Sequence, residues 1–322
     1  MNKEYKILVG DCIEKLRDLD DESVHTCVTS PPYYGLRDYG HDGQIGLEET
    51  PDEFVSKLVD VFREVRRVLR DDGTLWVNLG DSYAANRTYQ VPSTKGGPKH
   101  SHSQSAGGAG SKVPEGLKPK DLIGIPWMVA FALRADGWYL RQDIIWSKGN
   151  PMPESVRDRC TKAHEYIFLL SKSQRYRYDH EATKEPATGL QKDRDRAVIT
   201  GRGTQKTSAA RGGDRDRSGG YPTEGDTRNR RSVWNVNPKP FKGAHFAVYP
   251  PDLIEPCILA GCPEGGWVLD PFTGSGTTGV VALQNGRNFV GCELNPEYAE
   301  MARERIESEA MIRGVFDIIA QT

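Results

Sequence analysis

The chain has 322 residues with a net charge of -2, 37% hydrophobic residues and 27% charged residues. This length suits one large core, or one core with a smaller appended module. No apolar run approaches the roughly 18 residues that a membrane span needs, which excludes a helical span. The amino terminus, MNKEYKILVGDC, shows no long apolar segment followed by a small-residue cleavage site, so we expect a cytoplasmic protein.

The first part of the chain predicts strands that alternate with a helix. YKILVGD, at 5–11, and VHTCVTS, at 24–30, are short apolar runs typical of buried strands. A capping box starts a helix at Thr50, and apolar residues recur at helical spacing until the Asp-Gly pair at 72–73. TLWVNLGD, at 74–81, is the next strand. This alternation favours a mostly parallel sheet with helices on both faces.

Two irregular segments interrupt the later elements. Residues 84–120 are rich in Gly, Ser, Lys and His, which predicts a mobile loop. Between it and a second segment, 173–232, lie a helix, IGIPWMVAFALRADG, and two strands, WYLRQDIIWSK and HEYIFLLSK. The last part predicts a helix around DLIEPCILAGC, the strand GWVLD, the helix TTGVVALQNG, the strand NFVGCELN and the helix PEYAEMARERIESEA. We therefore expect one α/β domain, made of 1–172 and 233–322, with an insertion at 173–232.

Positive charge is concentrated in these irregular segments. Residues 84–120 hold six Lys and Arg against one Asp or Glu, and residues 174–231 hold fourteen against nine. Each therefore carries +5, which leaves -12 on the remainder of the chain. Basic segments on an acidic body are compatible with binding a polyanion.

The six cysteines are scattered, with no C-x-x-C pair and no His/Cys cluster at zinc spacing. Because free cysteine usually behaves as a small hydrophobic residue, we expect buried free thiols and no metal site.

A glycine-rich turn follows the strand GWVLD. DPFTGSGTTG places glycines at 274, 276 and 279, which fits the G-x-G-x-x-G fingerprint of a dinucleotide-binding turn. Glu293 ends the following strand, where such folds place a carboxylate for ribose hydroxyls. Taken alone, this pattern favours a nicotinamide-dependent oxidoreductase.

The late position of this turn points to a different cofactor. Only 52 residues follow Asp270, so the remaining strands of the sheet must come from the amino-terminal part, and the order is circularly permuted. Ordinary dehydrogenases do not show that order. S-adenosylmethionine also carries an adenosine, a ribose diol and a carboxylate, and it suits the glycine turn and the helix amino terminus equally well.

The segment TSPPYYGLRDYG presents hydrogen-bond acceptors with few donors. Pro31 and Pro32 have no backbone N–H, and the hydroxyl of Ser30 adds a further acceptor. Such a segment suits the exocyclic amino group of cytosine or adenine, whose lone pair is conjugated with the ring until its hydrogens are held out of plane. Tyr33 is placed to stack on the base. With the sulfonium methyl group of S-adenosylmethionine as the electrophile, the expected reaction is a single in-line displacement by the amino nitrogen. Such a step depends mainly on how the two reacting groups are positioned.

TSPPY and DPFTGSGTTG, in this order and separated by a long variable region, resemble the motifs of the amino-group DNA methyltransferases of the permuted class called beta. The resemblance covers roughly 5–170 and 232–305. It implies a Rossmann-like, S-adenosylmethionine-dependent methyltransferase fold in a bacterial, archaeal or phage-encoded protein. It also implies double-stranded DNA as the substrate, with the target base flipped out of the helix.

The resemblance assigns roles to particular residues. Residues 173–232 would be the target-recognition region, and 84–120 a loop able to close on DNA. Glu293 would hold the ribose, Asp11 the adenine amino group, and HFAVYP, at 245–250, would wall the methionine end of the pocket. The catalytic residues that it implies are Ser30, Pro31, Pro32 and Tyr33, and the cofactor-binding residues are Asp11, Phe246, Ala247, Asp270, Phe272, Gly274, Ser275, Gly276, Thr277, Thr278 and Glu293.

Family members with Ser before Pro-Pro mostly modify cytosine N4, whereas Asp or Asn there usually accompanies adenine N6. We therefore expect transfer to cytosine N4 and keep adenine N6 as the alternative. An RNA amino-methyltransferase, a nicotinamide oxidoreductase and a catalytically silent DNA-binding module also stay open. Two further partners are left open: a second copy of the chain and a cognate restriction endonuclease.

Overall fold

The computed structural model describes residues 3–35, 41, 43–84, 113–114, 116–187, 227–238 and 248–319, with side chains as far as residue 310. The chain divides into two compact units, one made of Met1–Tyr178 and Ser232–Thr322 and the other of Asp179–Arg231. Most of the predicted loop 84–120 lies outside the described residues.

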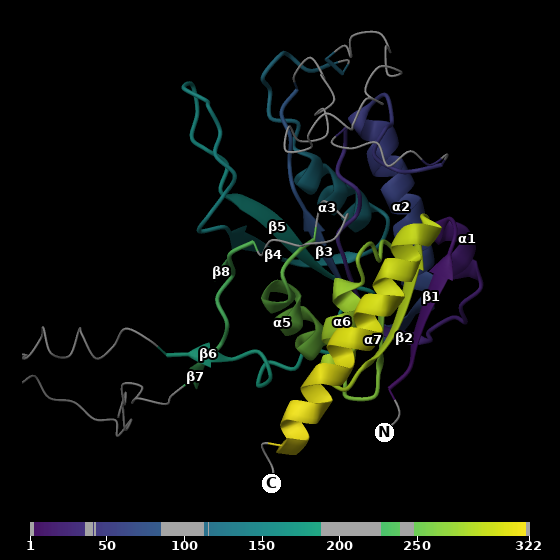
Figure 1. Cartoon of the computed structure of the whole chain (residues 1–322). Coiled ribbons are helices and arrows are strands. Elements are labelled where there is room, and N and C mark those ends of the chain that lie inside the picture. The colour runs from purple at the N-terminus through teal and green to yellow at the C-terminus, as the bar shows by residue number, and fades with distance from the viewer. Residues whose placement is uncertain are drawn as a thin grey trace, which may run out of the picture. The chain divides into compact units, whose positions relative to one another are not determined.

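The larger unit is an α/β structure (Figure 1). In chain order its elements are β1 (Tyr5–Val9), α1 (Cys12–Arg17), β2 (Val24–Thr29), α2 (Pro51–Val68), β3 (Leu69–Leu79), α3 (Ile125–Ala135), β4 (Tyr139–Ser147), β5 (His164–Ser171), β8 (Val233–Asn235), α5 (Pro251–Gly261), β9 (Trp267–Asp270), α6 (Thr277–Gln284), β10 (Asn288–Glu293) and α7 (Pro296–Ile319). The smaller unit contains the antiparallel pair β6 (Glu185–Pro186) and β7 (Thr227–Arg228).

Within the described residues, the eight strands of the larger unit form one sheet in the order β1-β10-β9-β2-β3-β5-β4-β8. The pairs from β1 to β3 are all parallel, and β5 runs antiparallel to both β3 and β4. The expected mostly parallel sheet is confirmed. The late strands β9 and β10 lie between β1 and β2, so the two ends of the chain share one sheet.

Side-chain alternation along β3 explains why helices cover both faces of the sheet. Leu75 and Val77 belong to the core cluster that includes α2 and α3, whereas Trp76, between them, belongs to the cluster that includes α5, α6 and α7. Successive residues of a strand point to opposite faces, so a strand buried on both faces must be continuously apolar. Burial of each such side chain contributes about 1.5–3 kcal/mol.

The helix α2 begins as predicted and ends earlier than predicted. The Thr50 hydroxyl accepts a hydrogen bond from the amide of Glu53, and the Glu53 carboxylate accepts one from the amide of Thr50, which completes the capping box. The helix was expected to continue to 72–73, but the fully buried Leu69 already has an extended backbone and pairs with Val24 of β2. Sheet pairing therefore overrides the helical pattern after Val68.

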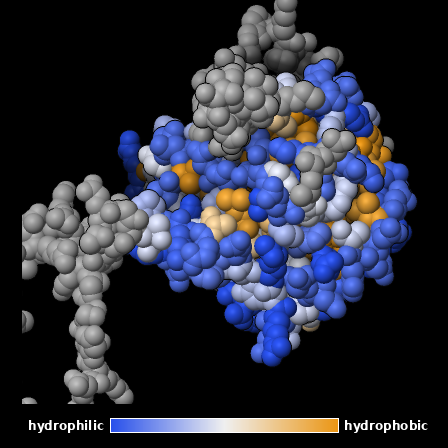
Figure 2. Space-filling model, turned by 90° about the horizontal axis from the view of Figure 1, so that it is seen from below, coloured by the Kyte–Doolittle hydropathy of each residue, from blue (hydrophilic) through white to orange (hydrophobic). Residues whose placement is uncertain are grey.

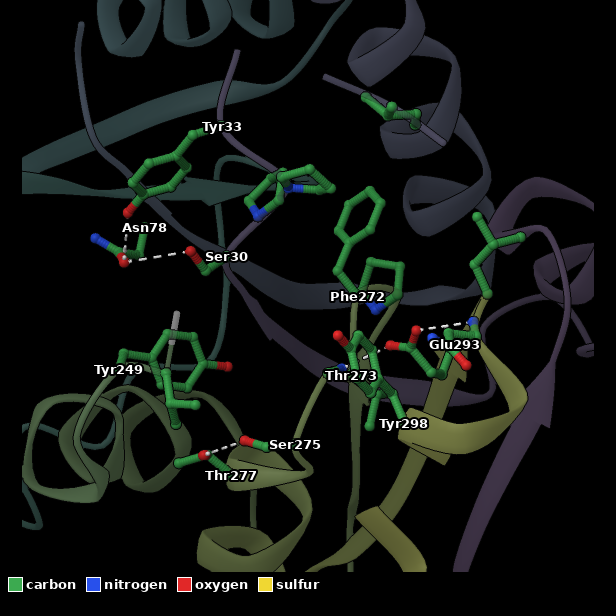
Figure 3. A pocket seen from close by; sticks show the side chains of 18 of the residues that line it. Ser30, Tyr33, Asn78, Tyr249, Phe272, Thr273, Ser275, Thr277, Glu293 and Tyr298 are labelled. Carbon is green, nitrogen blue, oxygen red and sulfur yellow. Dashed lines mark hydrogen bonds between the residues drawn. The ribbon is translucent and has the colours of Figure 1, made fainter. Parts of the chain in front are cut away.

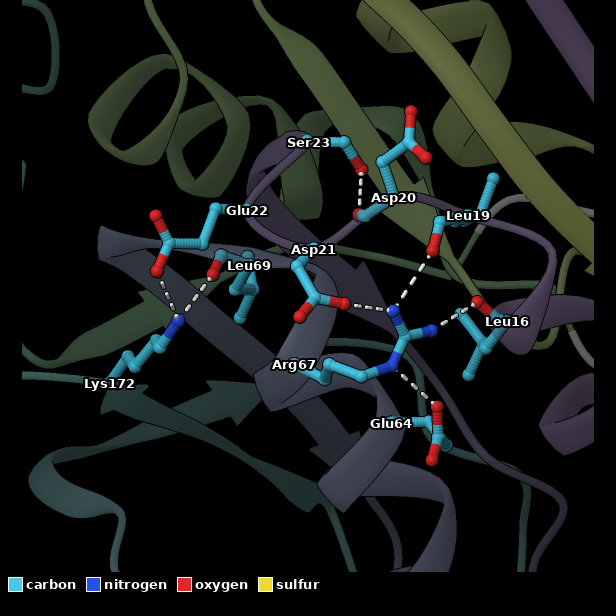
Figure 4. Close-up of polar contacts among 10 residues, drawn as sticks. All are labelled: Leu16, Leu19, Asp20, Asp21, Glu22, Ser23, Glu64, Arg67, Leu69 and Lys172. Carbon is cyan, nitrogen blue, oxygen red and sulfur yellow. Dashed lines mark hydrogen bonds and ion pairs between the residues drawn. The ribbon is translucent and has the colours of Figure 1, made fainter.

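The amino ends of β2 and β3 are held by two cations (Figure 4). Arg67 donates to the backbone oxygens of Leu16, at 2.7 Å, and Leu19, at 2.9 Å, which satisfies carbonyls at the end of α1. Lys172 donates to the backbone oxygen of Leu69 at 2.8 Å. The cations at this edge of the sheet are thus used to bond other groups of the protein.

The remaining expectations concern the surface and the thiols. In Figure 2 the visible face is mostly hydrophilic, with apolar side chains in small groups. No helix in the described part of the chain has the length and apolar character required to cross a bilayer. Five cysteines are buried as expected, but Cys160 is exposed, because it lies in the loop between β4 and β5.

Candidate functional site

A pocket of about 610 Å³ lies where the parallel strands end. Its lining includes residues that directly follow β1, β2, β9 and β10. Ligands of open α/β sheets bind at this edge, beyond the carboxyl ends of the strands. Figure 3 shows Ser30 and Tyr33 on one side of the pocket and Thr273 and Glu293 on another.

The glycine-rich loop between β9 and α6 forms one wall. Gly274 and Gly276 have positive φ values of 52° and 78°, which glycine adopts without strain. A Cβ at Gly276 would lie 3.0 Å from the Cβ of Ala302, so this glycine also lets α7 pack closely. Arg305 of α7 supports the loop by donating to the hydroxyls of Ser275, at 3.0 Å, and Thr277, at 2.9 Å.

Glu293 is fixed at the end of β10 by two backbone donors. Its Oε2 accepts from the amide of Gly274 at 2.8 Å, and its Oε1 accepts from the amide of Asn295 at 3.0 Å. Burial raises the pKa of the carboxyl group, and these hydrogen bonds oppose that effect. Each carboxylate oxygen keeps a second lone pair, so Glu293 can accept further bonds from a ligand in the pocket.

Asp11 lies beside Glu293 because β1 and β10 are adjacent parallel strands. Val9 pairs with Glu293, and the amide of Gly10 donates to the backbone oxygen of Glu293 at 2.9 Å. Asp11 caps α1, a helix that the sequence did not predict, with Oδ1 accepting from the amide of Ile13 at 2.9 Å. The side chain also lines the pocket, so capping and ligand contact are compatible.

Asp270 lies beneath the pocket and is only 1% exposed. Its carboxylate accepts from the hydroxyls of Thr29, at 2.6 Å, Thr278, at 2.5 Å, and Tyr249, at 3.1 Å, and from the amide of Phe272 at 3.0 Å. Burial raises the pKa of this carboxyl group, and the four hydrogen bonds oppose the shift. Asp270 thus ties the glycine-rich loop to the end of β2, directly before Ser30.

The predicted cofactor residues therefore divide into three groups. Among the described residues, Asp11, Phe272, Gly274, Ser275, Thr277 and Glu293 line the pocket. Asp270, Gly276 and Thr278 are absent from its described wall and support it from behind. Phe246 and Ala247 lie outside the described residues, although Val248 and Tyr249, from the same HFAVYP segment, line the pocket.

The four predicted catalytic residues, Ser30, Pro31, Pro32 and Tyr33, all line this same pocket. A Cβ at Gly80 would lie 2.6 Å from Cε2 of Tyr33, so the glycine after β3 leaves room for the tyrosine ring. The acceptor-rich segment and the glycine-rich loop, which are about 240 residues apart in sequence, thus face a common space.

Three further polar residues that line the pocket were not predicted from the sequence. Asn78 comes from β3, Glu165 from β5 and Lys148 from the residue after β4. The Oδ1 atom of Asn78 lies 3.4 Å from Ser30 Oγ, and Glu165 Oε2 lies 2.6 Å from the Tyr33 hydroxyl oxygen. The strands themselves were predicted, but which strand ends would meet was not. Among the described residues, no group of three or more His, Cys, Asp or Glu side chains could hold a metal ion.

Comparison with known proteins identifies the family. The family model described as DNA methylase matches residues 24–304. The chain is 52% identical to the type II methyltransferase M.Cfr9I of Citrobacter freundii, covering 93% of this chain and 87% of that protein. It is 50% identical to the type II methyltransferase M.SmaI of Serratia marcescens, covering 94% and 91%.

A solved structure of a similar protein indicates which cofactor the pocket binds. A putative DNA modification methylase from Thermus thermophilus, complexed with S-adenosyl-L-methionine, matches with a TM-score of 0.60 and 25% identity, covering 95% of this chain and 94% of that one. The glycine-rich loop and the carboxylates of Glu293 and Asp11 offer donors and acceptors that suit the adenosine, ribose diol and carboxylate of such a cofactor. The chain therefore belongs to the DNA methylase family of N6 and N4 amino-methyltransferases, and its methyl donor is S-adenosylmethionine.

Proposed function

We propose that this chain is a site-specific DNA methyltransferase that transfers the methyl group of S-adenosylmethionine to the N4 amino group of a cytosine flipped out of duplex DNA. The observation that carries the proposal is the placement of Ser30, Pro31, Pro32 and Tyr33 on the pocket that also holds the glycine-rich loop and Glu293. The acceptor groups proposed for the amine and the residues proposed to hold the methyl donor therefore line the same pocket.

At the cofactor end, the ionised Glu293 would accept hydrogen bonds from the ribose diol, and Asp11 would accept from the adenine amino group. Gly274 and Ser275, before the amino terminus of α6, would receive the methionine carboxylate, because this end of the helix favours negative charge. The cofactor supplies an electrophilic sulfonium methyl group. The protein's part is to hold it in one orientation.

At the base end, the segment between Ser30 and Tyr33 would hold the amino group. Ser30 donates its own hydrogen to Asn78, so its lone pairs remain for the hydrogens of the amine. The carbonyls near Pro31 and Pro32 have no competing amide donor. Tyr33 would stack on the base, which is worth about 1–3 kcal/mol.

The choice of cytosine rests on Ser30. A hydroxyl is a weaker acceptor than the carboxylate or amide that usually accompanies adenine N6 in related enzymes, so N6-methylation of adenine is the alternative. The test is incubation of the purified protein with unmethylated genomic DNA and methyl-labelled S-adenosylmethionine, followed by nucleoside mass spectrometry. N4-methylcytosine supports the proposal, and N6-methyladenine overturns the base assignment. Label found only in RNA from a parallel incubation overturns DNA as the substrate.

The remaining assignments extend this proposal. The positions of β9 and β10, last in the chain yet between β1 and β2 in the sheet, support the permuted beta class. The unit Asp179–Arg231 is proposed as the target-recognition region because it lies within the segment of charge +5. In it, Glu185 accepts from Arg228 at 2.9 Å and from Arg231 at 2.7 Å. A cytoplasmic location, a homodimer and a cognate restriction endonuclease stay as predictions from the sequence.

A further inference from the structure

The pocket wall contains an ion pair that the reaction described above does not use. Lys148 and Glu165 are paired at the pocket, with side chains that are only 19% and 14% exposed. Partly desolvated ion pairs contribute little net stability, because the loss of hydration offsets the attraction. The contacts of the Glu165 carboxylate show what else the pair does.

Glu165 fixes the orientation of the Asn78 amide. The Nδ2 atom of Asn78 donates to Glu165 Oε2 at 3.3 Å and to the backbone oxygen of Tyr166 at 3.1 Å. With both acceptors on the nitrogen side, the oxygen Oδ1 must face the opposite way. It lies 3.4 Å from both Ser30 Oγ and the Tyr33 hydroxyl oxygen.

Glu165 also determines which acceptor the Tyr33 hydroxyl donates to. The Tyr33 hydroxyl lies 2.6 Å from Glu165 Oε2 and 3.4 Å from Asn78 Oδ1. Hydrogen bonds to an ionised acceptor are shorter and stronger, so the tyrosine donates to the carboxylate. Asn78 Oδ1 is then left to accept the hydrogen of Ser30. The Ser30 oxygen consequently faces the pocket as an acceptor.

We propose that Glu165, held by Lys148, is a positioning residue that keeps Ser30 and Asn78 in the acceptor orientation required by the amino group of the target base. This inference rests on the proposed function. Both members of the pair are attached to rigid elements: Glu165 lies in β5, and the amide of Lys148 donates to the backbone oxygen of Ala163 at 2.8 Å. Lys148 also lies over the ring of Trp146, 4.2 Å from its centroid, which fixes the ammonium group.

The main test is Glu165→Gln, which keeps the shape and removes the charge. The neutral amide presents an NH₂ group either to Lys148 or to Asn78, and both are donors, so the Asn78 amide is free to turn and offer its own NH₂ to Ser30. We expect kcat for labelled methyl transfer to genomic DNA to fall about tenfold or more, with the calorimetric Kd for S-adenosylmethionine within about twofold of the wild type.

The matched control is Glu64→Gln, which breaks a partly buried ion pair with Arg67 at the opposite edge of the sheet. It should leave kcat within about twofold of the wild type. The wild type is assayed first: if it methylates no base, the proposed function fails, whereas a methylating wild type with an unaffected Glu165→Gln variant overturns only the role of Glu165.

A double variant separates positioning from stability. Lys148→Met alone leaves a buried carboxylate without its cation and should lower the melting temperature. Combining it with Glu165→Gln removes both charges and should restore the melting temperature while kcat stays low. Recovery of kcat together with the melting temperature would show that the pair is structural only, and so would a loss of activity in Glu165→Gln that merely parallels lost cofactor binding.

Discussion

The two edges of the parallel sheet use charged side chains in different ways. At the amino edge, Arg67 and Lys172 donate to backbone oxygens and carboxylates of the neighbouring turns (Figure 4). At the carboxyl edge, backbone amides donate to the carboxylates of Glu293 (Figure 3) and Asp11, and both residues line a pocket. Charge alone therefore does not mark the site. The site is distinguished by carboxylates that accept hydrogen bonds from backbone amides and also line the pocket of about 610 Å³.

Backbone connection explains part of this difference. At the amino edge, α2 passes directly into β3 at Leu69, and the pocket of about 470 Å³ there is lined by charged side chains, most of which pair with one another. At the carboxyl edge, the loop after β9 turns through Gly274 and Gly276, whose positive φ values let it curve away from the strand end. Substitutions at either edge test this difference. Their expected effects decrease in the order given below.

The largest effect is expected for Tyr33→Ala. Loss of the ring removes the proposed stacking surface for the base, worth about 1–3 kcal/mol, and one donor to Glu165, so methyl transfer to DNA should fall by about a hundredfold or more. Cofactor affinity, measured by calorimetry, should stay near the wild-type value because the ring lies at the proposed base end of the pocket. Tyr33→Phe, which keeps the ring, should retain measurable transfer. Unchanged turnover in Tyr33→Ala would contradict the catalytic assignment.

Glu293→Gln should weaken S-adenosylmethionine binding by about ten- to a hundredfold, the equivalent of 1.5–3 kcal/mol for hydrogen bonds to a charged group. The pH dependence provides a second readout. Because burial raises the pKa of Glu293 above the usual 4.5, its carboxylate becomes protonated at a higher pH than an exposed glutamate does. Wild-type affinity should therefore fall as the pH is lowered through that raised pKa.

In Glu293→Gln this fall should be absent, since the amide does not titrate. Calorimetric titrations of both proteins across the acidic range decide the point. Parallel pH profiles would exclude Glu293 as the group that titrates.

Asp270→Ala should destabilise the fold by about 3 kcal/mol or more, because the hydroxyls of Thr29, Thr278 and Tyr249 lose a buried acceptor. Asp270→Asn should cost much less, since these hydroxyls can turn to accept from the new amide. Denaturant unfolding measures both. Equal stability losses in the two variants would show that the charge of Asp270, rather than its hydrogen bonds, matters.

Arg67→Ala tests the amino edge. It removes the donors to the backbone oxygens of Leu16 and Leu19 and should lower the free energy of unfolding by about 2 kcal/mol. The Kd for S-adenosylmethionine should not change under conditions where the protein stays folded. A selective loss of cofactor affinity would mean that the two edges are coupled.

The smallest effect concerns the thiols. Cys160 is exposed, whereas Cys12, at the pocket, is buried and has a pKa raised to about 12 by burial. Native protein should therefore react rapidly with a thiol reagent at one position, and Cys160→Ser should remove that reaction. Methyl transfer by Cys160→Ser should equal that of the wild type. Rapid labelling that persists in Cys160→Ser would place another thiol at the surface.

The sequence predicted much of the fold because its signals are local. The capping box at Thr50 and the apolar strands around Trp76 and Val268 depend on neighbouring residues, and each appears where expected. The end of α2 and the short helix α1 were missed. In the first case a sheet partner overrides helical spacing, and in the second the helix is short and its local signals are Asp11 as a cap and Glu14 in the first turn.

Parts of the candidate site could be predicted where the residues of a motif are neighbours in the sequence. They could not be predicted where residues from distant segments must come into contact. Two prolines without backbone donors and a glycine-rich turn are readable from the chain itself, and so is the carboxylate of Glu293 at a strand end. The sequence alone thus predicted a mostly parallel α/β sheet and two segments that line the pocket, Ser30–Tyr33 and the glycine-rich loop.

Only the tertiary structure decided how other polar residues are used. Asn78, Glu165 and Lys148 come from three different strands or strand ends, and only the pairing of β3, β5 and β4 brings them to Tyr33. Asp270 was predicted to contact the cofactor from its motif, but its depth beneath the loop places it among four protein donors. Hydrogen bonding acts over about 3 Å in space, and sequence separation carries no information about that distance.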